Sequence, residues 1–110
     1  MANLYNPPAA ASGFTTQTDQ TGSRAINGTV YHNTTTKPIL CAVSFALHLN
    51  DILSFYSDIN ASPSQIIASD QNVNVASIIT TTTFLVLPGN YYKAVTTAGS
   101  PNLGQWIEYT

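Results

Sequence analysis

The sequence contains very little charge. Only 7% of its 110 residues are Asp, Glu, Lys or Arg, against about 25% in an ordinary soluble domain. The three basic residues, Arg24, Lys37 and Lys93, lie far apart in the chain, whereas nucleic-acid binding needs a basic patch that neutralises phosphates. With a net charge of −2, the chain is not expected to bind nucleic acid. Its uncharged surface favours contacts with other protein chains.

Cysteine and long apolar runs are also scarce. Cys41 is the single cysteine, which excludes an intrachain disulfide and a thiolate metal site. Its apolar surroundings, residues 39–43, predict a buried thiol. No apolar run reaches the ~20 residues of a membrane-spanning helix, and the first residues lack the basic and apolar regions of a signal peptide. We therefore expect a protein made in a cytoplasm, without a membrane partner.

The residues that usually carry enzyme chemistry are few and scattered. A metal site needs three or four convergent ligands, and nucleophilic catalysis needs a nucleophile beside a base. Aspartates in loops more often form turns by bonding their own backbone. We expect no enzyme activity, no metal and no cofactor. The residues considered were His32, His48, Asp51, Asp58, Asp70 and Glu108.

The clearest pattern in the chain is a strand over residues 39–49. Its odd positions are all apolar, and its even positions are mostly small or polar, which is the period of a strand with one buried face. We therefore expect the odd positions to lie in a core. They are Ile39, Cys41, Val43, Phe45, Leu47 and Leu49.

Other short β-prone runs follow each other between turn signals such as Asn27-Gly28 and Pro88-Gly89. No segment shows a helical period. Seven or eight short strands at this spacing predict one all-β domain, an antiparallel β-sandwich or jelly roll, over residues 21–110. Besides residues 39–49, strands are predicted at 29–32, 51–57, 65–69, 73–79, 80–87, 90–96 and 103–109.

Residues 1–20 read as an extended N-terminal arm. Pro7-Pro8 disfavours helix and strand in this segment. The segment is otherwise polar but contains three isolated apolar residues, Leu4, Tyr5 and Phe14. We expect these three to contact a neighbouring subunit or a partner surface. The alternative is a disordered tail.

Aromatic residues with polar tips anchor interfaces and also form sugar-binding platforms. Trp106 and roughly half of the tyrosines, Tyr31 among them, are expected in the core or at a subunit interface. The adjacent Tyr91 and Tyr92 are candidates for an exposed contact with a glycan or a partner.

Two stretches resemble small β-domains of tailed-bacteriophage virion proteins. The first runs from Thr21 as TGSRAINGTVYHNTTTKPI, with Arg24, Tyr31 and Pro38 at the matching places. The second is a strand closed by Pro88-Gly89, then Tyr91-Tyr92 and the ending LGQWIE, which contains Trp106 and Glu108. The likeness covers about residues 21–109, and its specificity lies in the order of the elements.

This resemblance implies a trimeric β-sandwich of a phage particle, either a head decoration (cement) protein or the end of a tail fibre. Because the sequence has only a short arm and no shaft, we expect a noncatalytic homotrimer that binds the major capsid protein on the outer capsid surface and stabilises it. The alternative is a tail-fibre or receptor-binding module that recognises a host surface glycan. A lone arginine at this place pairs with a carboxylate or with loop carbonyls, and Glu108 is the natural partner of Arg24.

Overall fold

The computed structural model describes residues 13–110, which form eight β-strands and one 3₁₀ turn. The described part of the chain contains no helix long and apolar enough to cross a membrane. In chain order the elements are β1 (Gln17–Asp19), the 3₁₀ turn η2 (Thr21–Ser23), β2 (Tyr31–His32), β3 (Ile39–His48), β4 (Ile52–Asp58), β5 (Ile66–Gln71), β6 (Ser77–Val86), β7 (Tyr91–Ala98) and β8 (Asn102–Tyr109).

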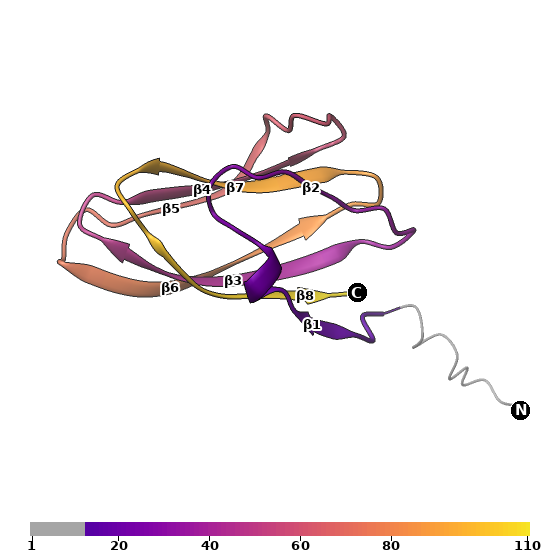
Figure 1. The fold of residues 1–110 in the computed structure, drawn as a ribbon, viewed down its shortest axis with the longest axis horizontal. Coiled ribbons are helices and arrows are strands. Elements are labelled where there is room, and N and C mark those ends of the chain that lie inside the picture. The colour runs from indigo at the N-terminus through magenta and orange to yellow at the C-terminus, as the bar shows by residue number, and fades with distance from the viewer. Residues whose placement is uncertain (1–12) are drawn as a thin grey trace, which may run out of the picture.

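The strands form two four-stranded antiparallel sheets that face each other (Figure 1). One sheet has the order β1-β8-β3-β6 and the other has the order β2-β7-β4-β5. The first strand therefore pairs with the eighth, the second with the seventh, the third with the sixth and the fourth with the fifth. This is the path of one long hairpin rolled so that successive strand pairs alternate between two sheets, which is the jelly roll. The predicted fold class is confirmed.

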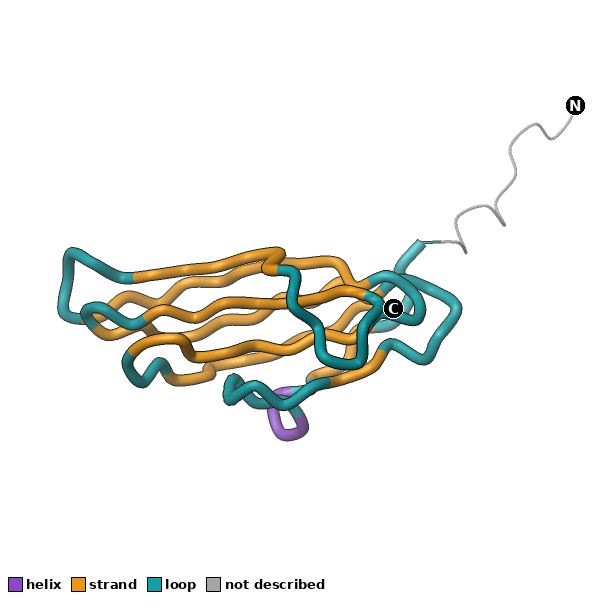
Figure 2. The backbone as a smooth tube through the Cα atoms, turned by 90° about the horizontal axis from the view of Figure 1, so that it is seen from above, coloured by secondary structure: helices purple, strands orange, loops and turns teal. Residues whose placement is uncertain are grey.

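The core lies between the two sheets, whose longest strands run alongside one another in Figure 2. Strand β3 supplies five buried side chains at alternate positions, as predicted, from Ile39 to Leu47. The opposite sheet contributes Leu53, Phe55 and Ala94. Burial of such side chains away from water stabilises the fold by roughly 1.5–3 kcal/mol each.

Several observed strands differ from the predicted ones. The strand predicted at 29–32 covers only Tyr31–His32, and β1 was not predicted as a strand. Leu49 was expected in the core, but β3 ends at His48, and Leu49 lies in the following turn with 49% of its surface exposed. The expected strand at 73–79 does not form, because the side chain of Asn72 is buried and donates to the carbonyls of Leu47 and Val75, which bends the chain. Residues 77–79 instead begin β6, which continues through the threonine run.

The segment expected to be an arm is joined to the sandwich within the described residues. The amides of Thr15 and Thr16 donate to the carbonyl of Thr110 at 2.8 and 3.0 Å, and the amide of Gln20 donates to the carbonyl of Trp106 at 2.7 Å. Strand β1 thus pairs with β8 of its own chain. Leu4 and Tyr5 lie outside the described residues.

Candidate functional site

The four residues singled out as structural or interface positions come together between the sheets. Strand β8 places Trp106 and Glu108 two residues apart, on the same inward face. Arg24 directly follows the turn η2, which lies outside the sheets, and Tyr31 is the first residue of β2. Because the amide of Trp106 donates to Oγ1 of Thr21 at 3.0 Å, the turn is fixed directly against β8.

Glu108 is the centre of this cluster and is 4% exposed. Arg24 approaches it as a fork: Nε donates to Oε2 at 3.0 Å and Nη2 donates to Oε1 at 3.1 Å. Oε2 also accepts hydrogen bonds from the Tyr92 hydroxyl at 2.9 Å and from Nε1 of Trp106 at 3.0 Å. A buried carboxylate needs such partners, because desolvation of an unpaired charge is costly. The predicted Arg24–Glu108 pair is confirmed.

The aromatic rings complete the cluster. The guanidinium of Arg24 lies 4.5 Å from the centroid of the Tyr31 ring, within the range of a cation–π contact. The Tyr31 ring lies 6.2 Å from that of Trp106, edge to face, and its hydroxyl accepts a hydrogen bond from the amide of Ala25 at 2.8 Å. Each strand or turn that enters the cluster is therefore held by at least one polar contact.

The cluster shifts the pKa values of its members. Burial would lower the pKa of Arg24, but its hydrogen bonds and electrostatic interactions with Glu108 and Tyr92 together outweigh burial and raise that pKa. Burial, followed by the charge of Glu108, raises the pKa values of the Cys41 thiol and the Tyr92 hydroxyl well above their ordinary ranges. The thiol lies 3.8 Å from Oε2 of Glu108. Cys41 and Tyr92 are therefore neutral hydrogen-bond donors to Glu108, which is a stabilising role.

Tyr92 was predicted as an exposed contact, and that prediction is wrong. It is 1% exposed and belongs to the Glu108 cluster. Adjacent residues of a strand point to opposite faces, so only one of the two neighbouring tyrosines can lie outside. Tyr91 is the outward one.

Tyr91 belongs to a small aromatic group on the outer face of the β2-β7-β4-β5 sheet. Its ring stacks on that of His32, with centroids 3.9 Å apart and planes 7° apart. Two residues further along β7, the ammonium of Lys93 lies 5.0 Å from the centroid of the Tyr56 ring on the neighbouring strand β4. These four side chains, His32, Tyr56, Tyr91 and Lys93, are named the aromatic group below. Sequence reasoning missed His32, Tyr56 and Lys93, because only the register brings them beside Tyr91.

On β8, β3 and β6, the outer face of the other sheet contains no Asp, Glu, Lys or Arg. The edge strand β1 adds one carboxylate at its border, because Asp19 is paired with Ile107. The residues on β8, β3 and β6 lie in rows across these strands, according to the strand registers. The middle of three rows is a small side chain of β3, and the middle of the fourth is Leu40. On β6, Ile79 and Leu85 are 84% and 47% exposed. This surface is named the uncharged face. It consists of Tyr109, Leu40 and Leu85; Ile107, Ala42 and Thr83; Gln105, Ser44 and Thr81; and Asn102, Ala46 and Ile79.

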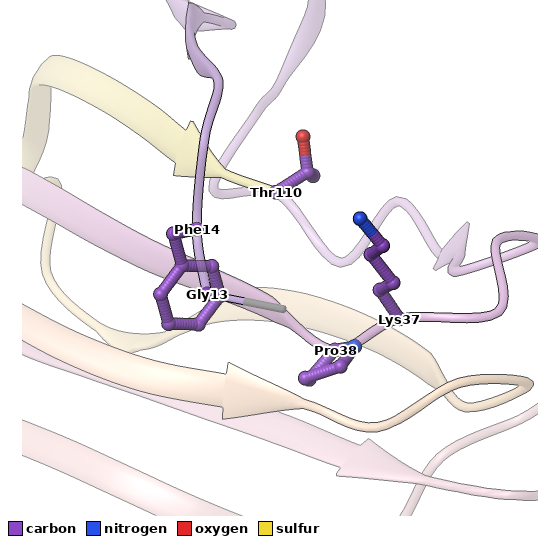
Figure 3. A pocket seen from close by; sticks show the side chains of 5 residues that line it. All are labelled: Gly13, Phe14, Lys37, Pro38 and Thr110. Atoms are coloured by element: carbon purple, nitrogen blue, oxygen red, sulfur yellow. The ribbon is translucent and has the colours of Figure 1, made fainter. Parts of the chain in front are cut away.

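A pocket lies where the described chain begins. It has a volume of about 150 Å³, and Figure 3 shows its five lining residues. Phe14, predicted as an arm contact, is 48% exposed and lines this pocket with Pro38 and Lys37. The expected contact of Phe14 with a neighbouring subunit or a partner surface stays a prediction.

A second polar cluster, centred on Asp51, connects two turns at one end of the sandwich. The carboxylate of Asp51 accepts hydrogen bonds from the amide of His48 at 2.7 Å and from the amide of Ser100 at 3.0 Å. It also lies 3.0 Å from Nδ1 of His48. Burial would raise the pKa of Asp51, but these hydrogen bonds outweigh it and lower the pKa. The cluster joins the β3–β4 turn to the β7–β8 turn and has the geometry of a structural corner.

Within residues 13–110, no three His, Cys, Asp or Glu side chains are grouped as a metal site would require.

Comparison with known proteins identified no matching family model, no matching curated protein and no matching solved structure.

Proposed function

We propose that this protein is a noncatalytic structural protein of a bacteriophage particle that binds the outer surface of the capsid and stabilises it. The observation that carries the proposal is the uncharged face, a broad sheet surface with exposed Ile79 and Leu85 and no ionic group. Large apolar side chains that are exposed on an uncharged surface favour a contact with another protein. The sequence resemblance to virion β-domains supplies the class of partner, the major capsid protein.

The placement of the charges supports an assembly role. Arg24 and Glu108 pair with each other between the sheets, and Asp51 and Asp58 accept backbone hydrogen bonds in turns. Charge is therefore used inside the fold and in turns, and it is absent from the uncharged face, which lies on β8, β3 and β6. In a dense array of identical copies, a face without charge avoids repulsion between neighbours. The homotrimer that the resemblance implies stays a prediction.

The experiment is a test of particle survival. Phage particles that lack the protein should lose infectivity faster on heating or osmotic shock, and added purified protein should restore survival. Gln105→Glu places one charge on the uncharged face at an exposed position and should fail to restore it. Thr97→Glu, at an exposed position on the opposite sheet, is the matched control and should restore it. Equal survival with and without the protein would contradict the proposal.

The aromatic group favours a second candidate function, recognition of a host surface glycan. His32, Tyr91 and Tyr56 occupy three neighbouring strands, which span about 10 Å, and aromatic rings with polar neighbours bind sugars by stacking. The test is binding of the purified protein to host cells or their surface polysaccharide. If glycan recognition is the function, Tyr91→Ala abolishes this binding while Gln105→Glu leaves it unchanged. No binding by the unmodified protein would exclude this candidate.

A further inference from the structure

The two sheets have four edge strands, and three of them are protected against pairing with another chain. Exposed edges offer unpaired backbone groups, and proteins shield them by short length, charge or irregularity. Strand β1 has three residues including Asp19, and β2 has two residues. Strand β5 carries Asp70, and its register with β4 shifts between Phe55 and Tyr56.

The fourth edge, β6, has none of these protections. It is ten residues long, it pairs with β3 over its whole length without a register shift, and within residues 13–110 no strand pairs with its other side. From Ser77 to Val86 it contains no charged residue, no proline and no glycine. Its outward side chains include Ile79, which is 84% exposed and is the most exposed large apolar side chain of the described chain.

We propose that β6 is a self-association edge, at which two copies of this chain pair their β6 strands antiparallel about a two-fold axis. A second copy fits this edge because it brings a strand of equal length that also contains no charged residue. The nearby carboxylate of Asp70 on β5 already accepts a hydrogen bond from the Thr82 hydroxyl of its own chain at 2.6 Å, so it does not enter the edge unpartnered. Each chain has one such edge, so the contact closes after two copies and does not propagate. This inference stands on the strand itself and does not depend on the proposed function.

The sequence of β6 selects one register. In a two-fold antiparallel pair, opposite residues must point to the same face, so the axis passes through a residue of the strand. An axis at Thr82 places Ile79 of each copy opposite Leu85 of the other, and Thr81 opposite Thr83. Both are favourable cross-strand pairs, and the first covers two exposed apolar side chains. An axis at Thr81 would instead place Ile79 opposite Thr83.

The paired edge also extends the uncharged face. Two β1-β8-β3-β6 sheets joined at β6 form one continuous eight-stranded sheet whose outer surface carries both copies of that face. In a trimer held together by another surface, each chain presents one β6 edge, and pairing of all three edges with those of one second trimer closes an assembly of six chains. The contact therefore predicts an even number of chains in every complete assembly.

The test is the mass of the purified full-length protein in solution, by light scattering or sedimentation. The unmodified protein should form a species with an even number of chains. Ile79→Lys alone and Leu85→Glu alone should each weaken the pairing by about tenfold or more, because the two-fold axis counts each substitution twice. Since both positions are solvent-exposed in the single chain, the thermal unfolding of each variant should stay close to that of the unmodified protein.

A mixture of the two variants identifies the register. Chains carrying Ile79→Lys should pair with chains carrying Leu85→Glu, because the axis at Thr82 places the two new charges opposite each other. Chains carrying Thr83→Glu should not restore pairing with Ile79→Lys. Thr97→Lys, on the other sheet, is the control and should leave the mass unchanged. A monomer throughout the micromolar range, an assembly that Ile79→Lys leaves intact, or open-ended aggregation would each overturn the inference.

Discussion

The guanidinium of Arg24 and the carboxylate of Glu108 form a two-point ion pair at 3.0 and 3.1 Å, although 84 positions separate them in the chain. The pair links the segment before β2 to the last strand, and Glu108 is otherwise enclosed by Tyr92, Trp106 and Cys41. It therefore fixes the N-terminal part of the described chain to the finished sandwich. The most direct stability predictions start from this pair.

Arg24→Ala should lower the free energy of unfolding by about 3 kcal/mol, near the low end for breaking a buried pair. The loss stays at that end because Tyr92 and Trp106 still donate to the remaining carboxylate. Urea unfolding followed by the fluorescence of Trp106, the single tryptophan, measures it. The control is Lys93→Ala, which removes a surface cation and should cost less than about 1 kcal/mol. Equal losses for the two variants would contradict the role of the pair.

Gly99→Ala should be strongly destabilising. Gly99 has a φ of +75°, and a Cβ atom there would lie 1.8 Å from Oδ1 of Asp51. Gly28, with a φ of +89° and no atom within 4 Å of such a Cβ, offers a matched control. Gly28→Ala should cost only the backbone strain of about 1–2 kcal/mol, and Gly99→Ala should cost clearly more. Equal losses of stability for the two variants in thermal unfolding would show that Asp51 can move away from the new Cβ atom at no energetic cost.

The stability of the protein should fall at acid pH. Hydrogen bonds lower the pKa of Asp51 and Asp58 from the ordinary value of 3.8. The unfolded chain then takes up protons before the folded chain does, so this contribution is complete above 3.8 and is lost as the pH falls through the folded-state pKa values. Urea midpoints measured from neutral pH downward should show this loss. The loss of stability at acid pH should be smaller in Asp51→Asn. If this variant and the unmodified protein lose the same stability as the pH falls, Asp51 does not contribute as described.

The Cys41 thiol should be unreactive in the folded protein. Burial and the neighbouring Glu108 raise its pKa above the ordinary value of 9.0, and the thiolate is the reactive form. A thiol reagent should modify Cys41 in urea and leave it unmodified in the native protein at mildly alkaline pH. Above pH 9.0 the unfolded chain loses the proton first, so stability should decline as the pH rises. Rapid labelling of the native protein would contradict this account.

The sequence predicted the elements whose pattern is local. Alternation alone identified β3 and its buried face, and the resemblance to phage β-domains, with a lone arginine and a terminal glutamate at the matching places, indicated Glu108 as the partner of Arg24. The sequence did not separate Tyr91 from Tyr92, because the inward face of β7 depends on its register with β4. It also did not reveal that β6 forms an edge, since edge position is a property of sheet order. In each case the missing information is a non-local pairing.

The position of the uncharged face could not be predicted from the sequence either. Its members come from three strands, and only their registers bring Ile79, Ala46 and Asn102 into one row. Low charge indicated in advance that some surface would be uncharged, but composition does not place it. The aromatic group likewise needed the β2–β7 and β7–β4 registers before His32 and Tyr56 could be set beside Tyr91.

The measurement that tests the central claim most directly is the copy number of this protein relative to the major capsid protein, by quantitative mass spectrometry of purified phage particles. The account predicts a near-stoichiometric ratio, with hundreds of copies on each particle. A handful of copies would place the protein on the tail and favour glycan recognition. Its absence from purified particles would contradict a structural role in the virion.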